Sequence, residues 1–400
     1  MSVSGAAFDS FSTASTLRGI TSSFFQLCLS LDIDPTDHSH VYQKLSTIDC
    51  WKAQKLFKLL DKRRQTPLYK GNSIASNLNV LVIGAGPCGL RAAIECALLG
   101  SRVVLIEQRD KFSRNNVLHL WEFVISDLKA LGAKFFYPKF CTGSIEHISI
   151  RQLQCILLKV ALLFGVEVYD SVSFRRYIDP SCEKSGFRAS LDPPDHILSH
   201  FEFDVLIGAD GKRNTIKDFT REEMRGKLAI GITANFVNRK TKAEEVIPEI
   251  SGVAYIFNQS FFKDMYKATG VSLENIVYYK DETHYFVMCA NKSSLLQEGV
   301  IKKDSDDVSF LLSPSNVDES NLRQFASRAA DFATEGLLPS LDFSSNQRGQ
   351  PDVAMFDFTS LYSSKNSVIL RKMNGRSLLL SIVGDSLHEP FWPTGSGCAR

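Results

Sequence analysis

The sequence predicts an α/β protein with a parallel sheet, a second and mainly antiparallel sheet, and a helical segment in front of both. Three observations predict this fold. An apolar, β-branched run at 80–83 leads into a glycine-rich turn and then into helix-forming residues. Two later apolar runs, 203–208 and 378–383, also end in glycine beside an acidic residue. Between 230 and 290, apolar and polar residues alternate as in antiparallel strands.

The glycine-rich turn after the first strand has the spacing GxGxxG. Gly84 allows the chain to leave the strand in a tight turn, and Gly86 leaves room for a pyrophosphate group. Gly89 lets the following helix, expected at 90–99, pack close to the sheet. The phosphates would then lie at the N-terminus of that helix. The strand–turn–helix context favours a dinucleotide site over a glycine turn without a ligand.

An acidic residue follows the next predicted strand. Glu107 comes 23 residues after Gly84, at the end of an apolar run at 103–106. A carboxylate in this place accepts hydrogen bonds from ribose hydroxyls and would repel a 2′-phosphate, so FAD or NAD fits better than NADP. Arg109 is evidence for NADP instead, because a nearby arginine can accommodate a 2′-phosphate.

Composition narrows the function classes. A net charge of +2 and a pI near 8.0 give no general case for binding nucleic acid or a membrane. No apolar run approaches the ~18 residues of a membrane-spanning helix. The nine cysteines are scattered and never spaced as CxxC, so the sequence predicts no disulfide framework and no metal site. We therefore expect a protein of the reducing cytoplasm.

The remaining chain divides into four parts: a helical segment at 1–76, a first part of the dinucleotide domain at 77–230, a β-sheet domain at 231–345, and a second part of the dinucleotide domain at 346–400. Apolar clusters at helical spacing predict three helices in the first part. This part also carries seven lysines and arginines between Lys52 and Lys70 against one acid. They form either a solvated helix face or a docking surface for an acidic partner.

Individual elements follow from the same patterns. An amphipathic run at 148–163 predicts a helix with Ser149 as its N-cap. A polar helix is expected at 320–335, and four strands of the second sheet are expected at 230–237, 253–257, 275–279 and 284–288. Asp210, in the turn after the 203–208 strand, has no role that the sequence reveals.

The sequence has three predicted strands that end in glycine near an acidic residue: the GxGxxG turn with Glu107, the turn with Asp210, and Gly384-Asp385. These strand ends, in this order, resemble the single-component FAD aromatic-hydroxylase class of flavoproteins. Further segments resemble the catalytic domain of the MICAL family, flavin monooxygenases that oxidise actin. These segments are CTGSIEHISIRQLQ, MRGKLAIGITANFVN, PEISGVAYIFNQSFF, ENIVYYKDETHYFVM, RAADFATEG, PDVAMFDFTS and EPFWPTGSG. The resemblance implies a Rossmann-like FAD-binding domain with a second, mainly antiparallel sheet.

The resemblance also implies site residues. Its cofactor-binding positions are Gly84, Gly86, Cys88, Gly89, Glu107, Arg109, Arg114, Asn116, Tyr285 and Asp385. Asp385 would bind the ribityl chain of FAD. Asn116 and Trp392 would border the isoalloxazine ring where the substrate approaches, and are the implied catalytic positions.

The implied reaction consumes NADPH and O2 and oxidises methionine residues of actin filaments to the sulfoxide, which promotes filament disassembly. Hydrogen peroxide is the expected product when no acceptor is bound. The resemblance implies a cytoplasmic protein that associates with the cytoskeleton. It also allows a nuclear pool of the protein. The sequence has no second nucleotide-binding motif, so NADPH would visit the flavin transiently.

Two alternatives stay open at this stage. An NAD-dependent oxidoreductase would satisfy the GxGxxG turn, although it leaves the strand end at 384–385 without a role. A truncated, non-catalytic FAD-binding or interaction module is the other alternative. MICAL proteins normally continue further, and the helix expected after Gly397 has almost no residues to form it.

Overall fold

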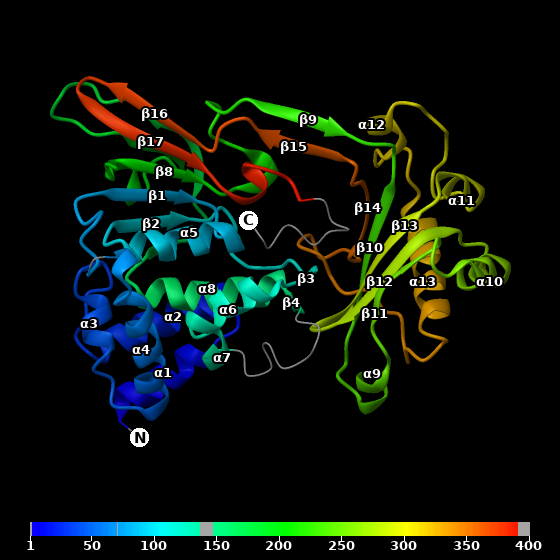
Figure 1. The fold of residues 1–400 in the computed structure, drawn as a ribbon, viewed down its shortest axis with the longest axis horizontal. Coiled ribbons are helices and arrows are strands. Elements are labelled where there is room, and N and C mark those ends of the chain that lie inside the picture. Colours follow the sequence, from blue (N-terminus) through cyan, green and yellow to red (C-terminus); the bar gives the residue numbers. More distant parts are fainter. Residues whose placement is uncertain (1, 70, 137–146, 391–400) are drawn as a thin grey trace. The chain divides into compact units, whose positions relative to one another are not determined.

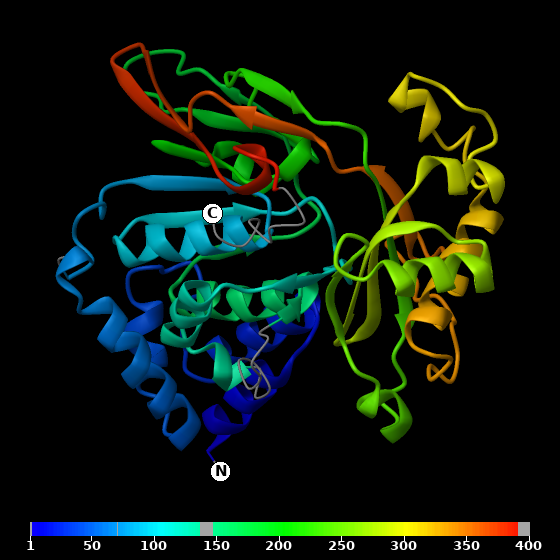
Figure 2. The ribbon, with the colours of Figure 1, turned by 45° about the vertical axis from the view of Figure 1, so that its right-hand side comes forward.

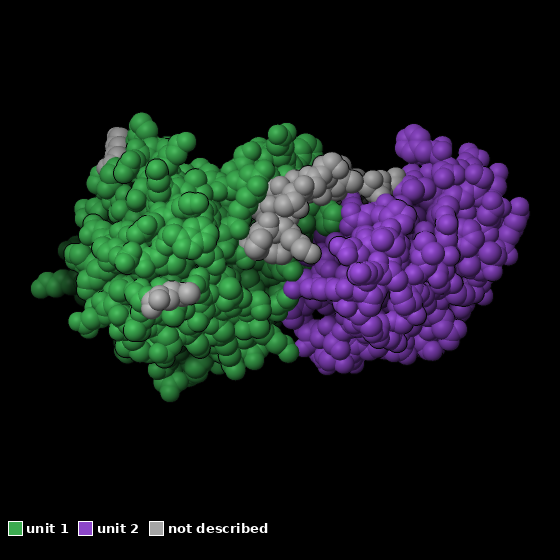
Figure 3. Space-filling view, turned by 90° about the horizontal axis from the view of Figure 1, so that it is seen from below, with its two compact units in different colours: residues 1–112, 118–223, 362–400 green, residues 113–117, 224–361 purple. Residues whose placement is uncertain are grey.

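The computed structural model describes residues 2–69, 71–136 and 147–390. Within them the chain forms two compact units, which Figure 3 colours separately. The first comprises residues 1–112, 118–223 and 362–400, and the second comprises residues 113–117 and 224–361.

The chain begins with four helices of the first unit: α1 (Val3–Thr13), α2 (Leu17–Leu29), α3 (Val41–Leu45) and α4 (Trp51–Arg64). The sequence predicted three, and the short helix α3 is the addition. A break separates α1 from α2 because the hydroxyl of Thr16 accepts a hydrogen bond from the Gly19 amide and so starts a new helix.

The first unit is built on a six-stranded sheet (Figure 1). Its strands, in spatial order, are β16 (Val368–Met373), β17 (Arg376–Ile382), β8 (Val205–Gly208), β1 (Asn79–Ile83), β2 (Arg102–Ile106) and β5 (Glu167–Tyr169). All neighbours pair in parallel except β16 and β17, which form an antiparallel hairpin. The strands predicted from the apolar runs at 80–83 and 103–106 are confirmed.

Successive residues of β1 enter different cores because side chains alternate across a strand. Val80 and Val82 belong to a core that includes residues of α5 (Pro87–Leu98), α8 (Ile150–Leu163) and the four N-terminal helices. Figures 1 and 2 both show α5 and α8 on one side of the six-stranded sheet. Leu81 belongs to a second core, which includes residues of the hairpin β6 (Ser173–Ile178) and β7 (Arg188–Asp192).

Shorter elements complete the first unit. They are α6 (Glu122–Ala130), α7 (Ala133–Phe136), β4 (His147–Ser149), the 3-10 turns η1 (Pro67–Tyr69), η2 (Ile197–His200), η3 (Gly211–Arg213) and η4 (Gly384–Ser386), and the last two residues of β3 (Val117–His119), whose Val117 belongs to the second unit. The predicted N-cap of α8 is confirmed, since the Ser149 hydroxyl accepts a hydrogen bond from the Gln152 amide at 3.3 Å.

The second unit holds a five-stranded antiparallel sheet. Its order is β11 (Ile250–Ala254), β12 (Leu273–Lys280), β13 (Thr283–Ala290), β10 (Ile230–Val237) and β14 (Val353–Asp357). Its core includes residues of α10 (Gln259–Thr269) and α13 (Glu319–Ala333). The unit also contains α9 (Lys242–Val246), α11 (Lys292–Gln297) and α12 (Val308–Leu311). Strands β9 (Arg221–Arg225) and β15 (Ser360–Ser364) pair separately.

The expected strand at 253–257 is wrong in its bounds. Strand β11 ends at Ala254, whose carbonyl accepts hydrogen bonds from the amides of Phe257 and Asn258, and so closes a turn. Asn258 then caps α10 by accepting from the Phe261 amide. The apolar side chains of Ile256 and Phe257 are consequently exposed, 74% and 84%, in a turn that their hydrophobicity did not predict.

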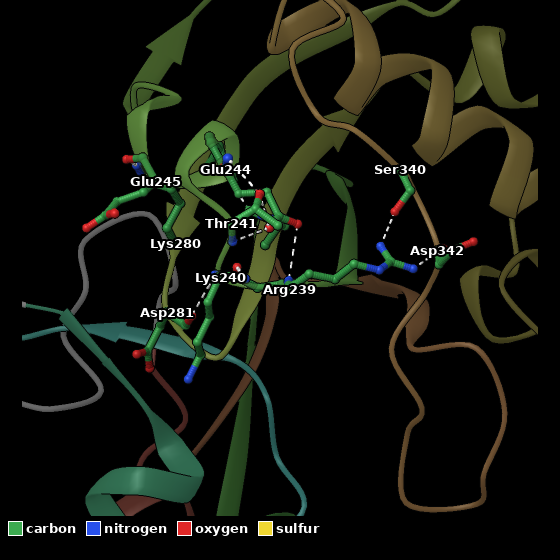
Figure 4. A network of polar contacts seen from close by, with 12 residues as sticks. Arg239, Lys240, Thr241, Glu244, Glu245, Lys280, Asp281, Ser340 and Asp342 are labelled. Carbon is green, nitrogen blue, oxygen red and sulfur yellow. Dashed lines mark hydrogen bonds and ion pairs between the residues drawn. The ribbon is translucent and has the colours of Figure 1, made fainter.

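A polar network holds the segment around α9 to the rest of the second unit (Figure 4). Thr241 and Glu244 form a capping box, and the Glu244 carboxylate also accepts from the Arg239 amide at 3.1 Å. Lys280 donates to the carbonyl of Glu245 at 2.6 Å, and Arg239 pairs with Asp342 at 2.6 Å.

Beneath this network lies a buried histidine. His284 is fully buried and lies between the Tyr278 hydroxyl, 2.8 Å from Nδ1, and Glu244 Oε1, 3.4 Å from Nε2. Burial lowers the pKa of His284 and outweighs the opposing effect of the hydrogen bond that the imidazole donates to the Glu244 carboxylate. For Glu244, burial is overcome by the hydrogen bonds from Thr241 and Arg239, which lower its pKa to about 2. The imidazole is therefore neutral beside an ionised carboxylate.

This geometry predicts a pH-dependent contribution to stability. His284→Gln should lower the melting temperature of the protein at pH 7.5, because a buried hydrogen-bonded group is lost. At pH 5.5 the difference from wild type should shrink. Below the ordinary histidine pKa of 6.5 the unfolded wild-type chain gains a proton that folded His284 does not take up, which destabilises only the wild type.

His200→Gln is the matched control, because His200 is an exposed histidine of the first unit. Melting curves of the three proteins at both pH values test the prediction. A His284→Gln difference that is constant or larger at pH 5.5 contradicts it.

Candidate functional site

The glycine-containing ends of β1, β8 and β17 leave the six-stranded sheet at the same level. Ile83 is in register with Gly208, and Gly208 is in register with Ile382. Because the three strands are parallel, the turns that follow them gather at one edge, where nucleotides bind in open α/β sheets.

The glycines of the first turn differ in what surrounds them. Gly84 has φ +102°, and a Cβ on it would lie 2.7 Å from the carbonyl oxygen of Ala209. A Cβ on Gly89 would lie 2.1 Å from the carbonyl oxygen of Gly84 and 2.9 Å from the Ala209 side chain. A Cβ on Gly86 would meet nothing nearer than 3.8 Å. Packing therefore requires two of the three glycines, whereas a Cβ on Gly86 would make only an ordinary van der Waals contact with the described residues, so that Gly86 leaves space in front of the N-terminus of α5.

Glu107 is buried, 7% exposed, and holds this turn in place. Its Oε2 accepts from the amide of Ala85 at 2.9 Å, and its Oε1 accepts from the amide of Arg109 at 3.0 Å. On the other side of the turn, Nε2 of Gln154 donates to the Ala85 carbonyl at 2.7 Å. The sequence did not single out Gln154, although a polar residue within the apolar run of α8 was a signal for it.

The third strand end packs against the first and the second. A Cβ on Gly384 would lie 3.0 Å from the Cβ and Sγ of Cys88. The hydroxyl of Ser386 donates to Asp210 Oδ1 at 3.2 Å, and Asp210 Oδ2 accepts from the Thr215 amide at 2.9 Å. Asp210, whose role the sequence left open, thus joins the turns after β8 and β17.

Two other predicted site residues meet within the second unit. Nδ2 of Asn116 donates to the hydroxyl of Tyr285 at 3.2 Å, and Tyr285 is 3% exposed. Burial raises the pKa of Tyr285, so the phenol is neutral near pH 7. The neighbouring Asn115 donates to Asp352 Oδ2 at 2.9 Å, and Asn235 donates to the same oxygen at 3.0 Å.

The predicted residues therefore form two groups, each within one unit. The group in the first unit is Gly84, Gly86, Cys88, Gly89, Glu107, Arg109 and Asp385, and the group in the second unit is Arg114, Asn116 and Tyr285. Arg114 is exposed, Arg109 is half-buried, and Trp392 lies outside the described residues. Sequence reasoning did not select Asp352 as a site residue, although Asp352 lies in PDVAMFDFTS, one of the segments that carry the family resemblance.

The first group fits a dinucleotide. The free space in front of Gly86 and the start of α5 at Pro87 suit a pyrophosphate, and the Glu107 oxygens keep lone pairs for ribose hydroxyls after binding two amides. Among the described residues, no group of three or more histidine, cysteine, aspartate or glutamate side chains is arranged to hold a metal ion.

Two family models match the chain. Residues 79–118 match a family described as FAD binding domain, and residues 228–357 match one described as Mical, Rossman domain. The second match covers the antiparallel sheet of the second unit, while the strand–turn–helix of the dinucleotide motif lies in the first match.

Curated relatives extend the likeness to nearly the whole chain. F-actin monooxygenase MICAL2 of Mus musculus is 57% identical over 398 residues, which cover 98% of this chain and 20% of that protein. The chain belongs to the MICAL family. MICAL3 of Homo sapiens is 56% identical over 98% of this chain and 20% of its own length. Mical of Drosophila melanogaster is 57% identical over 98% of this chain and 8% of its own length. The chain thus spans about a fifth of the mammalian MICAL proteins.

The predicted fold class is confirmed: a MICAL-type FAD-binding α/β domain with N-terminal helices and a second, antiparallel sheet. Among solved structures, the tetrameric form of 2-methyl-3-hydroxypyridine-5-carboxylic acid oxygenase aligns with 80% of this chain and 78% of its own, at 16% identity and a TM-score of 0.47. No helix in the described part of this MICAL chain is long and apolar enough to span a bilayer. The family membership favours FAD over the NAD-dependent alternative.

The glycine geometry predicts that two similar substitutions affect the stability of this MICAL chain without cofactor differently. Gly89→Ala should destabilise it by about 1–3 kcal/mol, because backbone must move to admit the new methyl group. Gly86→Ala should leave the melting temperature within about 1 °C of wild type, because the methyl group enters free space. Calorimetry of the three apoproteins measures both effects, and equal losses of stability would contradict the assignment.

Proposed function

We propose that this chain is an FAD-dependent, NADPH-consuming monooxygenase unit that oxidises methionine residues of actin to the sulfoxide. The observation that carries the proposal is the 57% identity, over 98% of the chain, to a protein named F-actin monooxygenase. A zebrafish relative, 56% identical over 98% of the chain, is named protein-methionine sulfoxide oxidase. The turns at the carboxyl edge of the first-unit sheet supply a binding site that suits FAD.

In this proposal the first unit holds the cofactor. Gly84, Gly86, Cys88 and Gly89 face the pyrophosphate, and Glu107 binds the adenosine ribose. Asp385 binds the ribityl chain, and Arg109 lies along the cofactor. Arg114, a residue of the second unit, is also proposed as a cofactor contact. When bound and reduced, FAD would supply the electrons that activate O2, of which one oxygen atom is transferred to sulfur and the other leaves as water.

NADPH is the proposed electron donor. The sequence contains one GxGxxG turn, which FAD would occupy, so NADPH is proposed to reach the flavin transiently instead of occupying a nucleotide fold of its own. In the absence of a methionine acceptor, reduced enzyme and O2 would release hydrogen peroxide.

The substrate side needs little acid–base chemistry. A methionine sulfur has a free lone pair and reacts with an electrophilic oxygen without losing a proton. Asn116, Tyr285 and Trp392 are the residues proposed for this side, and the structure describes the first two of them. The first two are hydrogen-bonded to each other and neutral near pH 7, which suits an uncharged thioether. Their role is to orient the cofactor and the side chain of the substrate.

Actin filaments are the proposed protein substrate, and filament disassembly is the proposed consequence. The chain would act at the cytoskeleton, where its substrate is assembled. The association rests on the names of the relatives, whose lengths this chain covers only in part.

Purified protein tests the function directly. We expect a flavin absorbance spectrum with about one FAD per chain, NADPH oxidation that filamentous actin stimulates, and a mass increase of one oxygen atom on actin methionine peptides. Actin incubated with NADPH alone, and with enzyme lacking NADPH, controls for spontaneous oxidation. A flavin-loaded protein that consumes NADPH but leaves actin methionines unmodified, both with and without catalase, would overturn the substrate assignment.

The Asn116–Tyr285 contact makes a narrower prediction. Tyr285→Phe keeps the ring but removes the hydroxyl that accepts from Asn116, a loss of about 0.5–1.5 kcal/mol of interaction. We expect FAD to remain bound and the actin-stimulated rate to fall roughly 3–10-fold, as that loss of energy allows. Tyr266→Phe, which changes a tyrosine 48% exposed on α10, is the control. Equal rates for both variants would contradict a role for the Asn116–Tyr285 pair.

A further inference from the structure

The segment that follows β17 carries a buried carboxylate that none of the proposed cofactor contacts uses. Glu389 is 3% exposed. Its Oε1 lies 3.1 Å from a terminal nitrogen of Arg221, and its Oε2 lies 3.1 Å from Nζ of Lys212. A buried carboxylate requires such pairing, because desolvation of an unpaired charge costs several kcal/mol.

The two cations are not equivalent. Lys212 is 73% exposed, so water screens its interaction with Glu389. The Arg221 side chain is 15% exposed, and its guanidinium lies over the ring of Tyr362, 5.2 Å from the ring centroid. The buried partner of Glu389 is therefore Arg221.

Arg221 also reaches the third strand-end motif. The terminal nitrogen that pairs with Glu389 donates to the backbone carbonyl of Asp385 at 3.2 Å. One nitrogen thus joins a buried carboxylate to the backbone of a proposed FAD-binding residue. A guanidinium suits this task because its donors lie in a rigid plane, whereas a lysine ammonium is a flexible point charge.

Backbone hydrogen bonds fix the remainder of the segment. The amide of Glu389 donates to the Tyr362 carbonyl at 2.9 Å, and the amide of Ser364 donates to the Leu387 carbonyl at 2.7 Å. On the opposite side, Ser386 is held by Asp210. Arg221 donates to the backbone carbonyl of Asp385 itself, and Glu389 pairs with Arg221 and holds it in that orientation.

We propose that Glu389 is a positioning residue for the cofactor: through Arg221 it fixes the backbone at Asp385 and so aims the Asp385 carboxyl group at FAD. The inference rests on the proposed function, in which Asp385 binds the ribityl chain. A buried ion pair is a poor source of net stability compared with apolar packing, but it defines one geometry. This pair contributes that geometry at the edge where the three strand-end turns meet.

Titration of apoprotein with FAD tests the proposal in the whole chain. Glu389→Gln removes the charge with little change in shape, and Arg221→Lys keeps both charges but removes the planar fork. Each should raise the dissociation constant for FAD, measured by quenching of flavin fluorescence, at least tenfold. Each should also change the visible circular dichroism of the bound flavin at saturation, which reports how the cofactor is held.

Glu222→Gln is the matched control, because Glu222 lies beside Arg221 on β9 and pairs with Lys365 at 2.7 Å with both side chains 59% exposed. It should bind FAD within twofold of wild type. Apoprotein melting temperatures separate positioning from folding. Variants that melt earlier but keep the wild-type dissociation constant and visible spectrum would show a purely structural ion pair and overturn the proposal.

Two further outcomes are decisive. If Glu389→Gln does not fold, Arg221→Lys decides, since it leaves no buried carboxylate without a cation. Wild-type protein that binds no FAD would overturn the proposed function and the positioning role with it. Wild-type protein that binds FAD while both variants bind equally well would overturn the positioning role alone.

Discussion

The first unit depends on how closely three strand ends approach one another. Gly89 lies where a methyl group would come within 2.1 Å of the Gly84 carbonyl oxygen, and Gly384 lies where one would touch Cys88 at 3.0 Å. No side chain larger than hydrogen fits at Gly89 without moving backbone. Gly86 is different, because the space before it is free. Close packing of the fold requires glycine at positions 89 and 384, whereas glycine at position 86 leaves room that a ligand would use.

The acidic residues near these turns bind groups of the protein itself. Glu107 binds the amides of Ala85 and Arg109, and Asp210 binds the Thr215 amide and the Ser386 hydroxyl. The turns are therefore held in shape by the protein's own hydrogen bonds. Preorganisation of this kind lowers the entropy that a cofactor has to lose on binding.

The sequence predicted the local elements best. The first strand, the glycine turn and the helix after it are adjacent in the chain, so residue spacing alone described them. The contacts that complete the site join distant residues: Asn115 and Asp352 are 237 positions apart, and Arg221 and Glu389 are 168 apart. Such pairs leave no periodic signal.

Where local pattern failed, tertiary contacts had decided the structure. The apolar residues Ile256 and Phe257 suggested a longer strand, but Asn258 caps α10 and closes a turn first. The role of Asp210 was equally invisible, because its partner Ser386 arrives with β17. The apolar run before Gly384 drew attention to Asp385, but its role as a ribityl-binding residue, and the choice of Tyr285 among the tyrosines, came from resemblance to a family.

The charges of the two groups of site residues match different tasks. Around the first-unit turns, carboxylates and guanidinium groups are paired or bound to backbone, as recognition of a polar dinucleotide requires. In the second unit, Asn116 donates to a phenol that burial keeps protonated, and burial raises the pKa of Asp352, whose oxygen accepts from two neutral amides. Oxygen transfer to a thioether moves no proton from the sulfur, so the neutral Asn116–Tyr285 pair is sufficient for the substrate side of the proposed reaction.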